Sequence, residues 1–265
     1  MAPKISVIMG IYNCASTLGG ALDSLYTQTY QNFKIILCDD GSTDHTYQIA
    51  KEYAEKKNNI VLLKNKTNLK LAATLNHCLQ YVDTEYVARM DGDDISLPTR
   101  FEKELNFLEN HPEYALVSCP MIHFDECGDW KIGKSIEKPT KESFRKFSPF
   151  CHAPVMIRTT VLKSVGGYTA EPKTERMEDY YLWYKIYKEG FVGYNLQDPL
   201  YKMRDDKNAV TRRKVSDRLR GFKTDLEITK GLGLSFYWVY PVLHLSKILV
   251  PQFMVPFVRK LKEKI

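Results

Sequence analysis

The chain has 265 residues, of which 44% are hydrophobic and 26% are charged, the proportions of an ordinary globular protein. This length suffices for a full hydrophobic core and one large domain with an appendage. The net charge of +6 is uneven: residues 1–200 carry 23 Lys and Arg against 26 Asp and Glu, whereas residues 201–265 carry 15 against 6. The positive field belongs to the tail, and the acidic remainder argues against a nucleic-acid-binding protein.

In chain order, the first half alternates between buried strands and amphipathic helices. Continuous apolar runs rich in β-branched residues predict the strands, and apolar positions at helical spacing predict the helices. The predicted strands cover 4–11, 33–38, 60–63 and 86–90; the predicted helices run from a Ser16-Thr17 cap to about 29, from a 42–44 cap to 57, over 71–82 and from Pro98 onward. This alternation predicts right-handed crossovers and a mostly parallel sheet.

The second half gives a mixed pattern. We predict strands over 115–119, 155–157, 191–195 and 200–204, a turn over 125–130, a helix end at 166–168 and a helix over 178–189. The composition changes after Asn208, where a helical tail begins. The six cysteines have no Cys-x-x-Cys spacing, which disfavours zinc and a disulfide framework and suits a reducing cytoplasm.

Two acidic clusters, 39–44 and 91–94, follow predicted strands. Ligands bind beyond the carboxyl ends of strands in such sheets, and crowded carboxylates there repel one another unless a cation or polar ligand satisfies them. In an extended segment Asp91 and Asp93 would point the same way. Converging carboxylate oxygens suit Mg²⁺ or Mn²⁺. A solvated acidic loop is the alternative interpretation.

Several motifs in this order resemble the family 2 glycosyltransferases, over about residues 5–204. They are 6–13, 39–44, Asn68 with Asn76, 88–94, Pro98 with Arg100, His152, Gly166-Gly167, and 177–180 with Leu182-Trp183. One residue departs from the pattern, because Lys70 stands where the family often has glycine. The resemblance implies the α/β fold called GT-A, with a mostly parallel central sheet flanked by helices. Residues 1–208 would form the catalytic domain and residues 209–265 a basic and apolar helical tail.

The resemblance also implies roles for individual residues. Asp179 is the expected general base, with Glu178 as the second choice. Asp93 is the expected metal ligand together with Asp91, and the metal would be Mn²⁺ or Mg²⁺. The acceptor and diphosphate side would include His152, Trp183 and Arg100. The nucleotide would contact Tyr12, Asn13, Asp39, Asn68, Asp91 and Arg204.

Each of these residues also has a structural interpretation. Tyr12 would then be a core aromatic and Asp39 a turn former, and the Glu178-Asp179 pair would simply favour a helix N-terminus. A lone histidine such as His152 is often a hydrogen-bonded structural residue. We interpret Asp40 and Asp44 as structural in either case, through turn and cap hydrogen bonds.

The apolar stretch 236–258 is interrupted by three prolines and Lys247, which disfavours a membrane span. Basic residues before and after it favour contact with an anionic membrane surface. The alternative is that the tail packs on the domain or pairs two copies as a homodimer.

We therefore expect a metal-dependent inverting enzyme that moves a sugar from a UDP-sugar to a hydroxyl of a glycan or lipid-linked acceptor, in surface polysaccharide synthesis at the inner face of the cytoplasmic membrane. Two alternatives remain. A non-catalytic protein on this fold would bind the UDP-sugar without turnover. A nucleotidyltransferase should carry a Gly-rich basic loop near the first strand, where this chain has Gly10-Ile11-Tyr12-Asn13.

Overall fold

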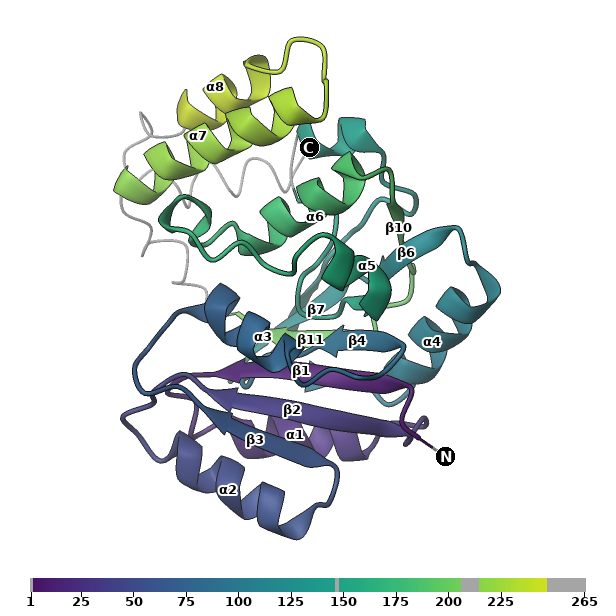
Figure 1. The fold of residues 1–265 in the computed structure, drawn as a ribbon, viewed down its shortest axis with the longest axis vertical. Helices are drawn as coiled ribbons and strands as arrows, with labels where there is room; N and C mark the ends of the chain where they lie inside the picture. The colour runs from purple at the N-terminus through teal and green to yellow at the C-terminus, as the bar shows by residue number, and fades with distance from the viewer. Residues whose placement is uncertain (1, 146–147, 206–214, 247–265) are drawn as a thin grey trace.

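The computed structural model describes residues 2–145, 148–205 and 215–246. A seven-stranded sheet lies at the centre, with strand order β10-β6-β9-β4-β1-β2-β3 (Figure 1). β1, β2, β3 and β4 are parallel to one another, while β9 is antiparallel to both of its neighbours. The strands are β1 Ile5–Ile11, β2 Phe33–Asp39, β3 Ile60–Lys64, β4 Tyr86–Arg89, β6 Tyr114–Ser118, β9 Met156–Arg158 and β10 Val192–Asn195.

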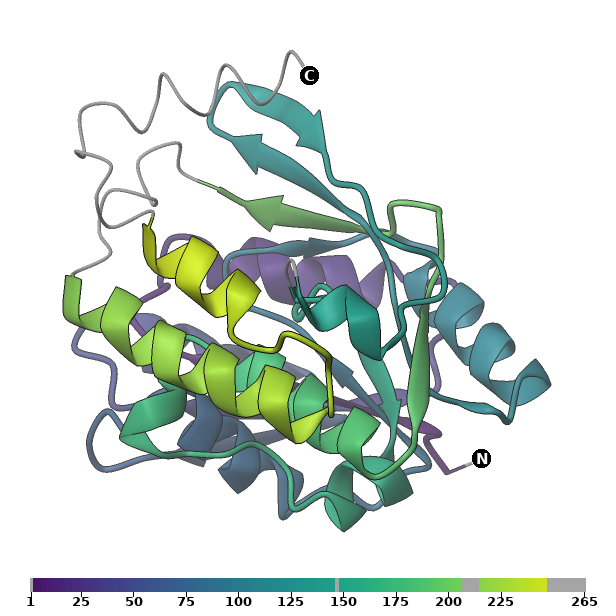
Figure 2. The ribbon, with the colours of Figure 1, turned by 90° about the horizontal axis from the view of Figure 1, so that it is seen from above.

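A second, four-stranded sheet has the order β5-β11-β7-β8. Seen from above, its β7–β8 hairpin projects beyond the large sheet (Figure 2). β11 pairs with β5 and with β7, so this sheet joins the acidic segment after β4 to the end of the domain. The strands are β5 Ile95–Ser96, β7 Met121–Asp125, β8 Gly128–Ile132 and β11 Tyr201–Arg204.

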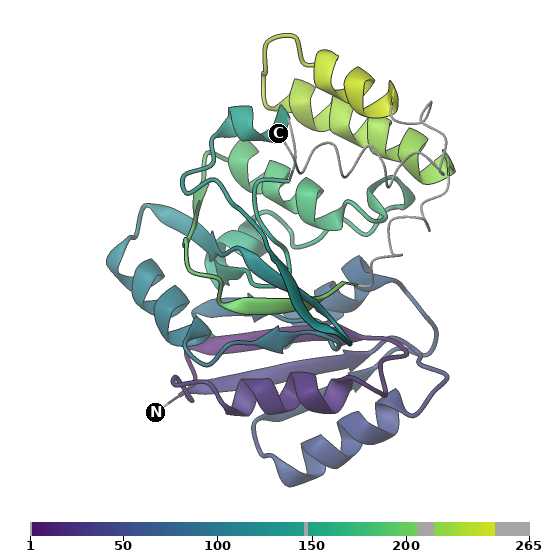
Figure 3. The ribbon, with the colours of Figure 1, turned by 180° about the vertical axis from the view of Figure 1, so that it is seen from behind.

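Helices cover both faces of the large sheet because its strands present apolar side chains alternately to each side. Ile8 of β1 belongs to one buried cluster with α3, α5 and α6, whereas Val7 and Met9 belong to the other, with α1, α2 and α4. Figure 3 shows α1 against the face of the sheet to which Val7 and Met9 point. The helices are α1 Leu18–Tyr26, α2 Thr46–Lys56, α3 Leu71–Leu79, α4 Arg100–Asn110, α5 Thr159–Ser164 and α6 Glu178–Lys188, with short 3₁₀ helices at Lys141–Arg145 and Pro172–Thr174.

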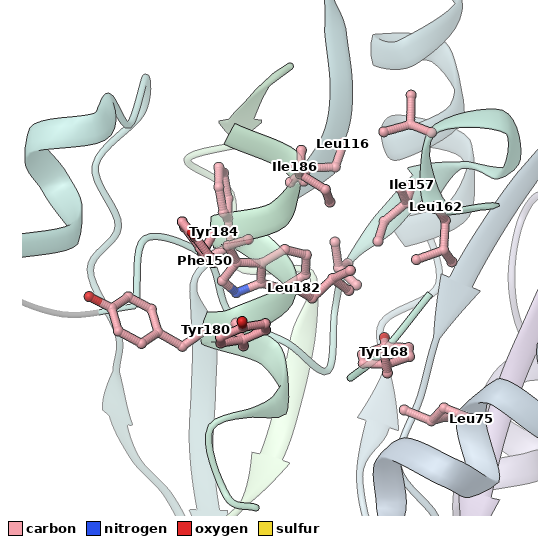
Figure 4. Packing of buried hydrophobic residues seen from close by; sticks show 14 of the residues in the cluster. Leu75, Leu116, Phe150, Ile157, Leu162, Tyr168, Tyr180, Leu182, Tyr184 and Ile186 are labelled. Carbon is pink, nitrogen blue, oxygen red and sulfur yellow. The ribbon is translucent and has the colours of Figure 1, made fainter. Parts of the chain in front are cut away.

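Aromatic side chains of α6 form the centre of the first cluster (Figure 4). Phe150 packs edge-on against Trp183, and Phe144 stacks on Tyr180. The tail helices α7 Val215–Gly231 and α8 Val239–Ser246 lie beyond α6, and Ile228 of α7 belongs to the same cluster. In the part of the chain described, none of the helices is both long and apolar enough to cross a bilayer.

The predicted α/β architecture is confirmed, including the helices that follow the sheet. Two local predictions need correction. Thr17 makes no side-chain cap on α1, because its hydroxyl donates to the carbonyls of Cys14 and Gly92 instead. The segment predicted as a turn over 125–130 is a hairpin whose residues from Gly128 onward form β8. Residues 209–214 and 247–265 of the predicted tail lie outside the described residues.

Candidate active site

A pocket of about 350 Å³ opens where β1 and β4 end side by side. This volume is within the range of small-molecule sites. Its walls come from the segment after β1, the acidic loop after β4 and the last residue of β11. The lining residues are Gly10, Ile11, Tyr12, Asn13, Cys14, Ser16, Thr17, Asp91, Gly92, Asp93 and Arg204.

The acidic loop is a turn, because β4 ends at Arg89. The strand alternation expected for Asp91 and Asp93 therefore does not apply. The turn still brings oxygen atoms of Asp91, Asp93 and Asp94 within 4.8 Å of one another. Gly92 permits this turn, since a Cβ there would lie 2.8 Å from Cys14 Sγ, and Thr17 Oγ1 holds its carbonyl at 3.0 Å.

β11 closes the acidic loop from the other side. The Asp91 N–H donates to the Tyr201 hydroxyl at 3.2 Å, and the Arg204 N–H donates to Asp94 Oδ1 at 2.8 Å. Asp94 Oδ2 is buried and has no hydrogen-bond partner in the described chain. Burial, with repulsion from Asp91 and Asp93, raises the pKa of Asp94 to about 8. Three crowded carboxylates with an unused oxygen fit a hard divalent cation.

The loop after β2 lies beside this pocket. Asn13 joins the two, because its side-chain oxygen accepts from the Thr43 N–H at 2.9 Å and its own N–H donates to Ser42 Oγ at 3.0 Å. Asp39 Oδ2 accepts from the Ser42 N–H at 3.3 Å, while Oδ1 is buried and finds no partner among the residues described. A buried acceptor left unpaired is costly, so this oxygen is suited to a ligand N–H.

Asp40 is hydrogen-bonded within the protein, to the segment that leads into α3. Its carboxylate accepts from Asn65 Nδ2 at 2.8 Å and from the N–H groups of Leu69 and Lys70 at 2.8 and 3.0 Å. These bonds hold the chain as it enters α3. Asn68 Oδ1 also accepts from the Lys70 N–H, at 3.1 Å. Asp40 is thus a structural residue, as is Asp44, whose oxygens accept from Thr46 and Ala15 N–H groups.

Glu178 and Asp179 form the first turn of α6. Burial raises the pKa of both carboxyl groups. Asp179 Oδ2 lies 3.5 Å from Ser148 Oγ, and Glu178 Oε2 is buried without a partner in the described residues. A carboxylate with a raised pKa is a better proton acceptor near neutral pH.

Residues 6–220 match the family described as Glycosyl transferase family 2. The chain belongs to this family. It is also 48% identical over 214 residues to the putative glycosyltransferase EpsE of Bacillus subtilis, a match that covers 80% of this chain and 76% of EpsE.

Two further similarities agree with the family. The chain is 33% identical over 218 residues to an Escherichia coli protein named UDP-Gal:alpha-D-GlcNAc-diphosphoundecaprenol beta-1,3-galactosyltransferase, covering 80% of this chain and 78% of that protein. The fold of this chain is similar to that of S. aureus TarS 1-349 in complex with UDP-GlcNAc, with a TM-score of 0.72 at 22% identity. The match covers 93% of this chain and 71% of the TarS chain. This family 2 glycosyltransferase therefore has the GT-A fold.

Two predicted site residues of this glycosyltransferase are buried elsewhere. Arg100 is fully buried in α4, where Nε pairs with Glu104 at 3.1 Å and Nη2 donates to the Arg89 carbonyl at 3.0 Å. A diphosphate could reach it only by breaking this pair. Trp183 is also fully buried and packs against Phe150, so it offers no face to an acceptor sugar. We replace both predicted roles with structural ones.

His152 packs against Tyr168 and Trp183. Its Nε2 is 2.9 Å from the Tyr168 hydroxyl, and its ring meets Trp183 edge-on. Burial, with the positive charge of Arg89, holds the pKa of His152 well below its usual range. His152 is therefore neutral and bonded to Tyr168.

Sequence reasoning missed two residues of this site. Arg89 forms an ion pair with Asp91 from within the sheet, and Tyr201 accepts the Asp91 N–H from β11. A positive residue just before an acidic cluster, in an otherwise apolar strand, was the available signal for Arg89. Tyr201 lies 110 residues from Asp91, and no local pattern links them.

Proposed function

We propose that this glycosyltransferase moves a sugar from a UDP-sugar to a hydroxyl group of a glycan or lipid-linked acceptor, with inversion and with the aid of a divalent metal ion. One observation carries this proposal: the acidic loop, the segment after β1 and Arg204 line one pocket at the carboxyl edge of the sheet, and Asn13 of that lining is hydrogen-bonded to the loop that follows Asp39. The names of the similar proteins support a UDP-sugar donor and, for one of them, a diphosphoundecaprenol-linked acceptor. Surface polysaccharide synthesis is the role that we propose with it.

The donor side is built from the first two strands and the acidic loop. Asp39 Oδ1 is the proposed acceptor for the N–H of a uracil ring, since it is buried and unpaired in the described chain. Tyr12 is 47% exposed and lines the pocket, so its ring is available to the nucleotide, with Asn13 beside it. Asn68 is not among the lining residues; it lies against the loop after β2, where its backbone nitrogen would be 3.0 Å from a Cβ at Gly41, and we keep it as a proposed nucleotide contact. Arg204 would face the diphosphate, because it lines the same pocket as Asp93.

The metal would be held by Asp91 and Asp93, with Asp94 as the third oxygen ligand. Mn²⁺ or Mg²⁺ bound there supplies stabilisation of the negative charge that grows on the leaving UDP.

The acceptor side is built from the start of α6. In a single displacement, the acceptor hydroxyl oxygen bonds to the anomeric carbon while the bond from that carbon to the phosphate oxygen breaks. Asp179 takes the proton of the attacking hydroxyl, and its raised pKa suits this role. Glu178 is the alternative base, because its free Oε2 is also buried.

We further propose that residues 209–265 attach the enzyme to the cytoplasmic face of an anionic membrane. Phe236, Trp238, Val242 and Leu243 near the α7–α8 turn are 45–74% exposed, which gives the tail an apolar contact surface. The charge of residues 201–265 favours anionic lipid. A second copy of the chain is the other occupant that this surface would fit.

A panel of UDP-sugars with Mn²⁺, scored for slow release of UDP, tests the function. We expect turnover with at least one donor, loss of turnover with chelator, and a fall of about 100-fold or more in Asp93→Asn. Asp198→Asn, which removes an exposed carboxylate of a surface ion pair, is the control and should match the wild type. Equal metal-dependent rates in Asp93→Asn would exclude the metal role. UDP binding without turnover on any donor and acceptor would favour the non-catalytic alternative.

A further inference from the structure

Arg89 is a buried cation at the end of β4, only 3% exposed. Its Nη2 donates to Asp91 Oδ1 as an ion pair, and its Nε has no hydrogen-bond partner in the described part of the chain. Burying a guanidinium is expensive unless opposite charges surround it. The carboxylates of the acidic loop provide that compensation, because Asp91 and Asp94 both act on Arg89.

Two other arginines near the large sheet, one half-buried and one fully buried, are used differently. Arg158 donates to the carbonyls of Tyr114 and Leu108 at 3.0 and 2.6 Å, which ties β9 to α4 and β6. Arg100 likewise pairs with Glu104 inside the fold and donates to backbone carbonyls. Arg89 instead directs its ion pair to a carboxylate that lines the pocket.

We propose that Arg89 is a positioning residue for sugar transfer, which fixes the Asp91 side chain in the donor pocket through their ion pair. This inference rests on the proposed function for its meaning but has its own physical basis. Without Arg89 the Asp91 side chain loses its ion-pair partner.

Two variants test this ion pair. Arg89→Lys keeps the charge but not the planar fork that matches a carboxylate. We expect it to weaken UDP binding about tenfold by calorimetry. Arg89→Met removes the charge as well, so its loss of UDP affinity should be larger than that of Arg89→Lys.

Arg158→Met is the matched control, because Arg158 pairs across from Tyr86 at the opposite end of β4. It should lower the melting temperature without changing UDP affinity. Wild-type UDP affinity in Arg89→Lys overturns the proposal, even if Arg89→Met fails to fold. These readouts need no turnover, so an inactive wild type that binds UDP would count against the proposed reaction and not against Arg89.

Discussion

The backbone N–H of Arg204 donates to the Asp94 carboxylate at 2.8 Å across a separation of 110 residues. This bond fixes the end of β11 against the acidic loop, so that the Arg204 side chain reaches the same pocket as Asp91 and Asp93. The side chain proposed to meet the diphosphate and the carboxylates proposed to hold the metal are therefore positioned by one short contact between the end of β11 and the acidic loop.

Asp179→Asn is expected to slow sugar transfer roughly 10²–10⁴-fold, because the acceptor hydroxyl loses its proton acceptor. Burial raises the pKa of Asp179. As the pH is lowered, the wild-type rate should therefore begin to fall while the pH is still above the ordinary carboxyl range. A profile of kcat/KM against pH checks this, with Asp83→Asn, an exposed surface change, as the control. A wild-type profile that stays flat down to pH 4 would contradict the assignment.

The ionised Asp179 carboxylate that serves catalysis should lower the stability of the fold. A folded pKa above the unfolded value means that stability is complete below the unfolded pKa and is lost as the pH rises through the folded one. Asp179→Asn should therefore melt at a higher temperature than wild type at pH 8, and the difference should shrink toward about pH 4. Identical melting temperatures at both pH values would rule out a strained carboxylate here.

Lys70→Gly is expected to stabilise the fold by about 1 kcal/mol. Lys70 has φ 73° and ψ 163°, a region that is almost restricted to glycine, and the Asp40 carboxylate holds it there. Denaturant unfolding measures the change. Lys66→Gly, at an exposed position of the same loop without positive φ, should be neutral or destabilising. A loss of stability in Lys70→Gly would mean that the lysine side chain contributes more than the strain costs.

Gly167→Ala should cost about 3 kcal/mol and Gly166→Ala about 1 kcal/mol. Both residues have positive φ, but a Cβ at Gly167 would lie 2.6 Å from Asn76 Oδ1, while no described atom lies within 4 Å of one at Gly166. Asn76 bonds both backbone groups of Tyr168, so its displacement breaks two hydrogen bonds. Chemical denaturation of the pair checks this, and equal losses would leave backbone conformation as the sole cost.

The double change Phe236→Ser with Trp238→Ser is expected to weaken binding to phosphatidylglycerol vesicles at least about tenfold, because two exposed aromatic side chains no longer enter the interface. Ile132→Ser on β8, which is 60% exposed, should leave binding unchanged. Vesicle sedimentation measures the effect. If the wild-type protein does not bind vesicles but elutes as a dimer, and the double change dissociates that dimer, the apolar surface is a contact with a second copy of the chain.

The parts of the fold that local pattern determines could be predicted from the sequence. Apolar runs such as that of β1 identify buried strands, and the Gly166-Gly167 pair correctly marked the end of α5. The antiparallel place of β9 between β4 and β6 could not be predicted, because pairing partners tens of residues apart leave no periodic signal.

In the candidate site, too, residues marked by a local pattern were found, and residues whose burial depends on the tertiary fold were not. Asp39 and the 91–94 loop were found because acidic residues follow apolar strands. The structure places Asp91 and Asp93 in the pocket lining, and Asn13 of that lining is hydrogen-bonded to the loop that follows Asp39. Arg100 and Trp183 were misplaced because residue type alone does not reveal burial. The i, i+4 spacing of Arg100 and Glu104 on the face that carries Phe101 and Leu105 was the one available hint of a buried ion pair.

The position of β9 also has a consequence for synthesis of the chain. Tyr86 pairs with Arg158 across 72 residues, so a nascent chain that has already made β1 to β4 must wait for that stretch to leave the ribosome. Until then the β4 edge offers unpaired backbone groups to any neighbouring strand. Slow translation before residue 158 would therefore expose this enzyme to aggregation at the strand that carries its acidic loop.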